Sequence, residues 1–133
     1  MIEVEVLLEA GVAAERLPPA AEVTRLCALA AGSLGVGDGH LAVEFVQERR
    51  IAQLNARYRG KAAPTDVLSF PVDGAEDPAG PRELGDVLIC PAHTVDLREA
   101  IVHGVLHLLG MDHEVDEGEM LALQKELLAR AGA

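Results

Sequence analysis

Three histidines within one eleven-residue segment are the residues of this sequence best suited to chemistry. His103, His107 and His113 have the spacing H-x3-H-x5-H. Each residue of an α-helix turns by about 100°, which places His103 and His107 on one face, one turn apart. Gly110 allows the helix to end and the chain to reverse, which can return His113 to that face. The spacing predicts a three-histidine site for a zinc-like ion, with a further coordination position open to water, as in catalytic zinc sites.

The same segment argues against ordinary peptidase chemistry. Its spacing resembles the H-E-x-x-H-x-x-G-x-x-H signature of metal-dependent proteases. Gly104 stands where those enzymes carry the glutamate that acts as general base. Because glycine has no acid–base chemistry, we expect a shared metal geometry without peptide hydrolysis. The remaining helix residues are apolar, and histidines buried among them are costly unless something binds them.

Length and composition fit one compact domain over residues 1–133, of which 50% are hydrophobic. The N-terminus alternates acidic and apolar residues rather than forming a signal peptide, and no apolar stretch approaches the ~20 residues of a membrane span. We therefore expect a cytoplasmic protein without membrane association. Cys27 and Cys90 are isolated, so we expect both to be reduced and buried. Cys90 is disfavoured as a zinc ligand, since the histidines already supply an open set.

The charge pattern combines an acidic chain with one basic segment. The net charge of −11 argues against nucleic-acid binding by bulk charge. Five of the 11 basic residues nevertheless fall between positions 49 and 61 with no acidic residue among them: Arg49, Arg50, Arg57, Arg59 and Lys61. A second segment is strongly acidic and contains Asp112, Glu114, Asp116, Glu117 and Glu119. The basic segment is open to two interpretations, a solvated helix face or a surface that steers RNA to the site.

The periodicity of apolar residues predicts the elements that position these groups. Strands are predicted over 2–7, 41–46, 67–70 and 87–90, and helices over 20–31, 48–57, 96–109 and 117–129. Asp96 is a candidate N-cap of the histidine helix, with Glu99 three positions later. Residues 32–39 and 73–81 read as loops. This order of elements predicts an α+β fold, a small sheet with helices packed on it.

Four motifs in sequence order carry a family resemblance. They are NARYRGK at 55–61, PTDVLSFP at 64–71, LGD at 84–86 and HGVLHLLGMDH at 103–113. Over roughly positions 41 to 128 the chain resembles the bacterial YbeY family of endoribonucleases and rRNA maturation factors. The resemblance implies a small mixed β-sheet with packed helices and a zincin-like histidine helix. It also implies that residues 1–133 form a single metal-dependent endoribonuclease domain. The connector over 91–95 is short by comparison with the family pattern.

The resemblance further implies a function and its residues. The expected activity is that of a zinc-dependent hydrolase, a single-strand-specific endonuclease of RNA. The expected process is maturation of the 3′ end of small-subunit rRNA, together with ribosome quality control. One Zn²⁺ per chain would be bound by His103, His107 and His113, and both Arg59 and His103 would be catalytic residues. The implied partners are single-stranded rRNA and small-subunit ribosomal proteins, with no DNA or membrane.

The residues also suggest how such a site would act on a phosphodiester. The guanidinium of Arg59 is a planar fork suited to phosphate or to charge that develops in a transition state. No side chain is an obvious general base. Asp112 is either a partner that orients an imidazole or a turn residue that binds its own backbone. We expect Asp66 and Asp86 to be caps or turn residues rather than acids in the reaction.

Two rival functions remain open at this point. The first is a metal-dependent hydrolase of a non-RNA substrate, which a deep and enclosed apolar pocket would favour. The second is a non-catalytic ribosome assembly factor stapled by zinc, which a fourth protein ligand such as His93 would favour, because structural zinc is usually fully ligated by protein. An open cleft lined by Arg59 and Lys61 would instead favour RNA.

Overall fold

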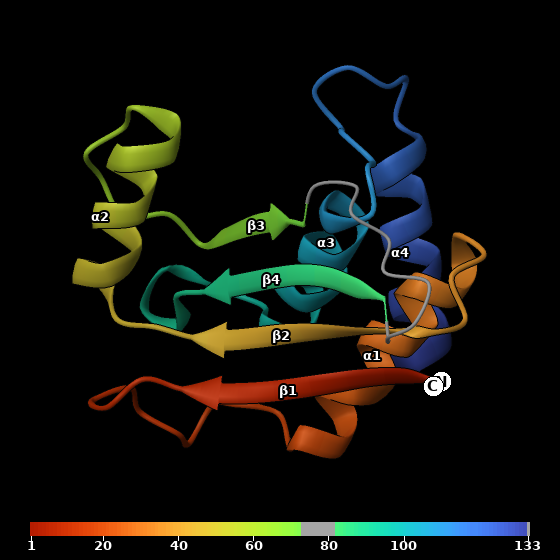
Figure 1. Cartoon of the computed structure of the whole chain (residues 1–133), viewed down its shortest axis with the longest axis horizontal. Helices are drawn as coiled ribbons and strands as arrows, with labels where there is room; N and C mark the ends of the chain where they lie inside the picture. The colour runs from red at the N-terminus through yellow and green to blue at the C-terminus, as the bar shows by residue number, and fades with distance from the viewer. Residues whose placement is uncertain (73–81, 133) are drawn as a thin grey trace.

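A mixed sheet of four strands organises the molecule (Figure 1). The computed structural model describes residues 1–72 and 82–132, so the loop predicted over 73–81 lies outside the described residues. The strands are β1 (Ile2–Leu8), β2 (Gly39–Phe45), β3 (Val67–Pro71) and β4 (Glu83–Ile89). The helices are α1 (Ala20–Ser33), α2 (Glu48–Arg59), α3 (Leu97–Leu108) and α4 (Glu119–Gly132), with a 3₁₀ turn, η1 (Pro91–His93), before α3. Each predicted strand and helix outside 73–81 has its counterpart.

The strand order is β1-β2-β4-β3. The β1/β2 and β2/β4 pairs are parallel, whereas β3 runs antiparallel to β4. The sheet is therefore small and mixed, and the α+β prediction is confirmed. The antiparallel strand β3 occupies one edge of the sheet, next to the helix that carries the histidines.

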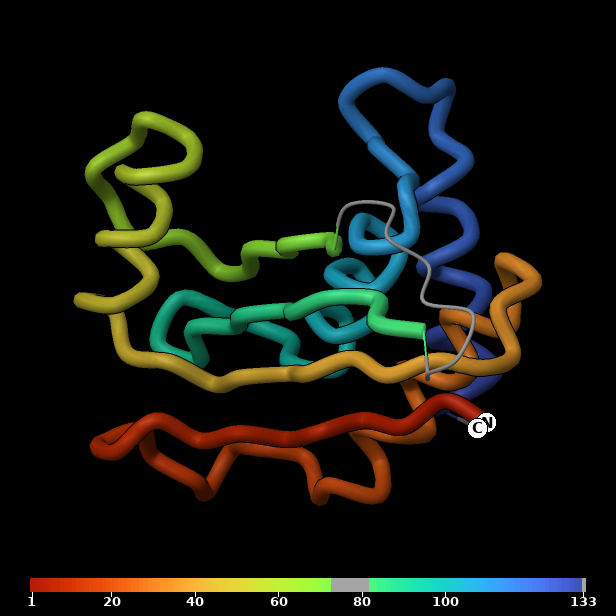
Figure 2. Tube along the Cα trace, in the orientation of Figure 1, coloured from red at the N-terminus to blue at the C-terminus, as the bar shows by residue number. Residues whose placement is uncertain are grey.

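Helices α1, α3 and α4 gather on one side of the sheet, while α2 stands apart near the carboxyl ends of β2 and β4 (Figures 1 and 2). The main core lies between the sheet and the three gathered helices and contains Leu26, Val43, Phe45, Ile101 and Leu106. A second, smaller core holds α2 against the other face through Val46, Ile51, Leu68, Leu88 and Cys90. This second core anchors the helix that ends in Arg59.

The histidine helix α3 is fixed at its start by a side-chain cap. Asp96 Oδ1 accepts a hydrogen bond from the backbone N–H of Glu99 at 3.1 Å, as its sequence position predicts. The short connector before the cap is held by Arg16, whose guanidinium donates to the carbonyls of Pro91 at 2.9 Å and Thr94 at 2.7 Å. The connector is therefore tied to the loop after β1 rather than free.

Gly104 brings α3 unusually close to the sheet. A Cβ at this position would lie 2.4 Å from Val87 Cγ1 and 3.1 Å from Val67 Cγ2. The Ser69 hydroxyl donates a 2.7 Å hydrogen bond to the Gly104 carbonyl. The residue that replaces the protease glutamate thus faces the sheet, and its missing side chain is required by helix–sheet packing.

Both cysteines are buried and unpaired, as predicted. Burial raises the pKa of the Cys27 thiol to about 12, so this thiol stays protonated. Cys90 belongs to the second core. Across the described residues, no helix combines the length and apolarity needed to cross a membrane.

Candidate metal centre and its cleft

The three histidines predicted from their spacing converge. The centroids of the His103 and His107 rings lie 4.8 Å apart, and each lies 5.2 Å from the His113 centroid. One ring nitrogen from each residue can be chosen so that all three lie within 4.8 Å of one another. Each histidine is half-buried. Three imidazole nitrogens converging in this way match the donor set of a catalytic zinc site.

The convergence follows from one helix and one reversal. His103 and His107 lie one turn apart on α3, which ends at Leu108. Gly110 follows with φ +105°, a left-handed conformation that favours glycine, and turns the chain back. His113 then lies in the segment that leads to α4. Asp112 Oδ1 accepts the N–H of Glu114 at 2.9 Å, which agrees with the interpretation of Asp112 as a turn residue.

Gln124 of α4 holds one histidine in place. Its Oε1 lies 2.7 Å from His103 Nδ1, and the residue is buried, with 7% of its surface exposed. Because an amide oxygen only accepts, His103 Nδ1 carries the proton and Nε2 is left for an ion. Sequence reasoning missed this residue. The available signal was a polar side chain within the inward-facing series Met120, Gln124, Leu127 and Ala131 of an otherwise apolar helix face.

Burial and the neighbouring imidazoles favour the neutral form of His107. Burial lowers the pKa of His107, and the neighbouring His103 and His113 lower it further. Neutral imidazole is the form that binds metals. The lowered pKa of His107 therefore favours the form of this side chain that can bind an ion.

A cleft of about 430 Å³ opens beside the histidines, and we call it the triad cleft. Its lining comes from the end of α2, from β3 and its preceding loop, and from the reversal after α3: Arg59, Thr65, Asp66, Val67, Leu68, Ser69, His103, His107, Asp112, His113 and Glu114. The predicted Arg59 is thus brought to the histidines, whereas Lys61 is not among the lining residues. A buried Asn55, whose Nδ2 donates to the Ala63 carbonyl at 2.8 Å, pins the loop between Arg59 and β3.

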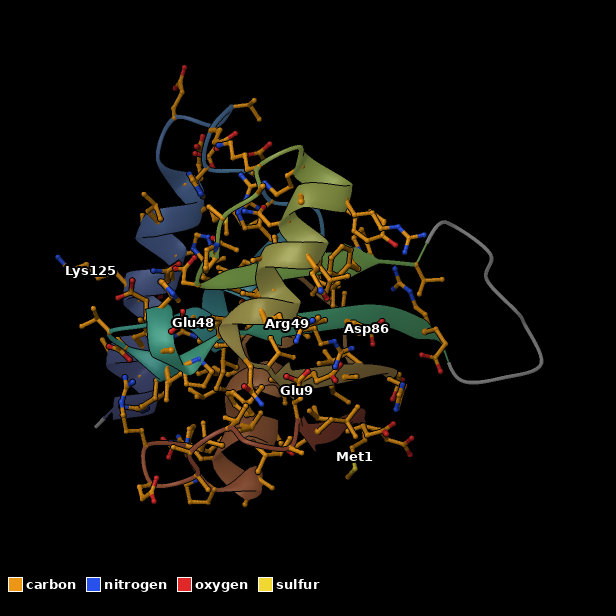
Figure 3. All side chains as sticks on the ribbon, turned by 90° about the vertical axis from the view of Figure 1, so that its left-hand side faces the viewer. Met1, Glu9, Glu48, Arg49, Asp86 and Lys125 are labelled. Carbon is orange, nitrogen blue, oxygen red and sulfur yellow. The ribbon has the colours of Figure 1, made fainter. Side chains whose placement is uncertain are left out.

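Arg49 and Arg50 of the predicted basic segment lie away from the Arg59 end of α2. Arg50 forms ion pairs with Glu44 and Glu9. Arg49 lies at the opposite end of α2 from Arg59, beside Glu48 (Figure 3). Because α2 is 12 residues long and these two arginines lie near its opposite ends, they do not form one continuous surface.

Other polar candidates lie outside the histidine group. Within the described residues the group contains three histidines, and His93 instead approaches Glu48, with Nε2 3.4 Å from a carboxylate oxygen. Asp66 is a turn residue whose Oδ1 accepts the N–H of Val67, although it also lines the triad cleft. The expectation that Asp86 is a cap or turn residue is wrong, because it lies inside β4 and is exposed (Figure 3).

Comparison with known proteins gives consistent matches along the chain. A family model described as Endoribonuclease YbeY matches residues 20–132. Proteins of that name from Rubrobacter xylanophilus and Macrococcus caseolyticus are 43% and 37% identical to this chain, over 94% and 92% of it and 93% and 90% of their own lengths. The solution structure of a Thermotoga maritima protein aligns with a TM-score of 0.53 at 27% identity, covering 96% of this chain and 88% of that one.

Proposed function

The chain belongs to the Endoribonuclease YbeY family, and we propose that it is a zinc-dependent endonuclease of single-stranded RNA. The proposed substrate is rRNA, the proposed reactions are maturation of the small-subunit 3′ end and ribosome quality control, and the proposed site of action is the cytoplasm. Small-subunit ribosomal proteins are proposed as further partners. The observation that carries the proposal is the presence of a three-histidine group and an arginine in one cleft.

We assign one Zn²⁺ per chain to His103, His107 and His113. The choice of ion rests on the chemistry of the donors, since three neutral imidazoles suit zinc and leave a position that protein does not fill. When bound, such an ion supplies Lewis acidity to a phosphoryl oxygen and lowers the pKa of water. In the described residues the group offers three ligands rather than four, which favours a catalytic site over a structural staple.

The chain's own residues bind and orient the phosphodiester. Arg59 reaches the triad cleft from the end of α2, and its planar fork can donate two hydrogen bonds to a phosphate in front of the histidines. Gln124 keeps the His103 imidazole in one tautomer and orientation. Gln124 thus orients a ligand, whereas Arg59 supplies the positive charge that would stabilise charge developing on the phosphate.

The test compares the RNA cleavage of two variants, each with one arginine of α2 replaced by alanine. We expect Arg59→Ala to lower kcat/KM on a labelled single-stranded RNA by roughly 100-fold, the effect of losing one donor to a transition-state oxyanion. Arg49→Ala, at the other end of α2, is the control and should cleave like the parent. Zinc content should be one ion per chain in both variants, and it should fall in both after treatment with a chelator.

Three results would contradict the proposal. One is a purified protein that neither contains nor takes up zinc. Another is unchanged cleavage by Arg59→Ala. The third is equal cleavage of single-stranded RNA, duplex RNA and DNA of the same sequence. The rRNA assignment is tested with an oligonucleotide that carries an extended small-subunit 3′ end, which should be cut at one position.

A further inference from the structure

A second pocket adjoins the histidines on the side away from Arg59, and we call it the side pocket. Its volume is about 540 Å³, within the range of small-ligand sites. It is lined by Asp66, Val67, His93, Thr94, Val95, Asp96, Glu99, Ala100, His103, His113, Leu121 and Gln124. Asp66, Val67, His103 and His113 also line the triad cleft. The two hollows therefore meet at the histidines, and a chain molecule bound there would extend to both sides of them.

The lining of the side pocket is unsuited to phosphate. Its charged side chains are the carboxylates of Asp66, Asp96 and Glu99, and among the described residues no lysine or arginine lines it. Besides His103 and His113, one further imidazole lines the pocket, that of His93, and its Nε2 lies 3.4 Å from a carboxylate oxygen of Glu48. Carboxylates repel phosphate but accept hydrogen bonds from amino groups.

Apolar surface accompanies these acceptors. Val95 is fully exposed at 100%, and Leu121 is 49% exposed, although both are large apolar residues. A flat group suits this lining if its faces pack on the apolar side chains and its edge donates hydrogen bonds to the carboxylates. Nucleobases have this character, because their faces are apolar and their edges carry amino groups.

Hydrogen bonds from Arg16 and Thr94 hold the wall of the side pocket in place. The Arg16 guanidinium donates to the carbonyls of Pro91, Thr94 and Val95. The Thr94 hydroxyl donates to the Cys90 carbonyl at 2.7 Å and is buried. A wall that is ordered in advance loses less conformational entropy when it binds.

We propose that the side pocket binds the nucleobase of the nucleotide next to the scissile phosphate. This inference rests on the proposed function and deepens it. The phosphate lies at the histidines and Arg59, the strand continues past His103 and His113, and the adjacent base packs on Leu121 and Val95. The carboxylates of the pocket favour bases that present an amino group.

The experiment uses single-stranded RNA with an abasic ribonucleotide placed directly 5′ or directly 3′ of the cleavage position that the parent protein defines. We expect one of these two substrates to be cleaved about tenfold more slowly, because the missing base no longer packs in the side pocket. Leu121→Ser should slow cleavage of the intact RNA to a similar extent and should be insensitive to that abasic substitution. Leu8→Ser is the matched control, since Leu8 is also 49% exposed but lies on β1.

The outcomes separate this inference from the proposed function. If the parent protein cleaves no RNA, the proposed function itself is wrong. If it cleaves but is indifferent to an abasic nucleotide at either position, the base subsite is wrong. The subsite is also wrong if Leu121→Ser and Leu8→Ser cleave equally fast. A change in sedimentation alone for Leu121→Ser would mark the pocket as a protein contact and exclude a base there.

Discussion

At the scale of single residues, the histidine group depends on neighbours that carry no metal-binding chemistry themselves. Gly110 provides the left-handed turn that returns His113 to α3. Gln124 fixes the tautomer of His103 from a different helix. The three histidines could be predicted because they lie within one short segment whose helical geometry is known. Gln124 could not, because its partner is 21 positions away in sequence and the contact arises only when α3 and α4 pack.

Replacing Gln124 should weaken metal binding more than it weakens folding. Gln124→Met keeps the size of the side chain but removes the acceptor for His103 Nδ1, so we expect zinc affinity to fall by about 10- to 100-fold. Competition with a zinc chelator measures this loss. Nitrogen-15 NMR of the metal-free variant should show that His103 no longer holds a single tautomer.

Two further variants complete this test. Gln53→Met changes an exposed glutamine of α2 and should leave zinc affinity unchanged. Gln124→Glu keeps an acceptor and should retain most of the affinity. Parent-like zinc binding by Gln124→Met would show that the hydrogen bond does not prepare His103 for the ion.

At the scale of elements, the position of α3 depends on the space left by Gly104. Placing a Cβ there would clash with Val87, and backbone or side chains must shift to admit it. We expect Gly104→Ala to lower the free energy of unfolding by about 1–3 kcal/mol, the usual cost of overpacking, despite the better helix propensity of alanine. Urea denaturation followed by circular dichroism measures the change.

Gly32 supplies the matched control for this substitution. It lies in α1, and a Cβ there would meet nothing within 4 Å. Gly32→Ala should therefore stabilise the protein by up to about 1 kcal/mol through helix propensity alone. If both substitutions change stability in the same direction, close packing is not the reason for glycine at position 104.

The elements also show where sequence reasoning stops. Strand and helix positions follow from apolar periodicity, which is a local property. Arg49, Arg50 and Arg59 are close in sequence, but this proximity does not place them on one surface of the folded protein. Arg50 forms ion pairs with Glu9, in the loop after β1, and with Glu44 on β2, and the pairing of β1 with β2 brings these two acids together. The connector before α3 is likewise shaped by the distant Arg16.

At the scale of the whole molecule, acidic charge gathers on the sheet face away from α1 and α3. Four acidic residues lie near one another here: Glu5, Glu44, Glu83 and Asp86. His40 partly offsets it, with Nδ1 3.0 Å from the Glu83 carboxylate and Nε2 3.7 Å from that of Glu5. The hydrogen bond from His40 to Glu83 raises the His40 pKa. The triad cleft has acidic residues of its own, since Asp112 and Glu114 line it, and Arg59 is the arginine that it offers to the RNA backbone.

This acidic face should make stability depend on pH through Asp86. Partial desolvation on the sheet, followed by repulsion from Glu44 and Glu83, raises the pKa of Asp86 above its ordinary value of 3.8, although the residue is largely exposed. The charged carboxylate is therefore less favourable in the folded state than in the unfolded one. Above the raised pKa this penalty is fully present, and it disappears as the pH falls below the ordinary value. Asp86→Asn removes the penalty, so we expect it to stabilise the protein at pH 7 and to lose that advantage toward pH 4.

Urea midpoints of the parent and of Asp86→Asn at pH 7, 5 and 4 measure this dependence. The difference between the two proteins should shrink steadily as the pH falls, because the folded-state carboxyl takes up its proton first and the penalty is lost as the pH approaches the ordinary pKa of 3.8. Glu15→Gln, an exposed acid in the loop after β1, is the control for removing one negative charge from the chain. Equal stabilisation by Glu15→Gln would assign the effect to net charge, and an unstabilised Asp86→Asn at pH 7 would show that the sheet face tolerates its carboxylates without cost.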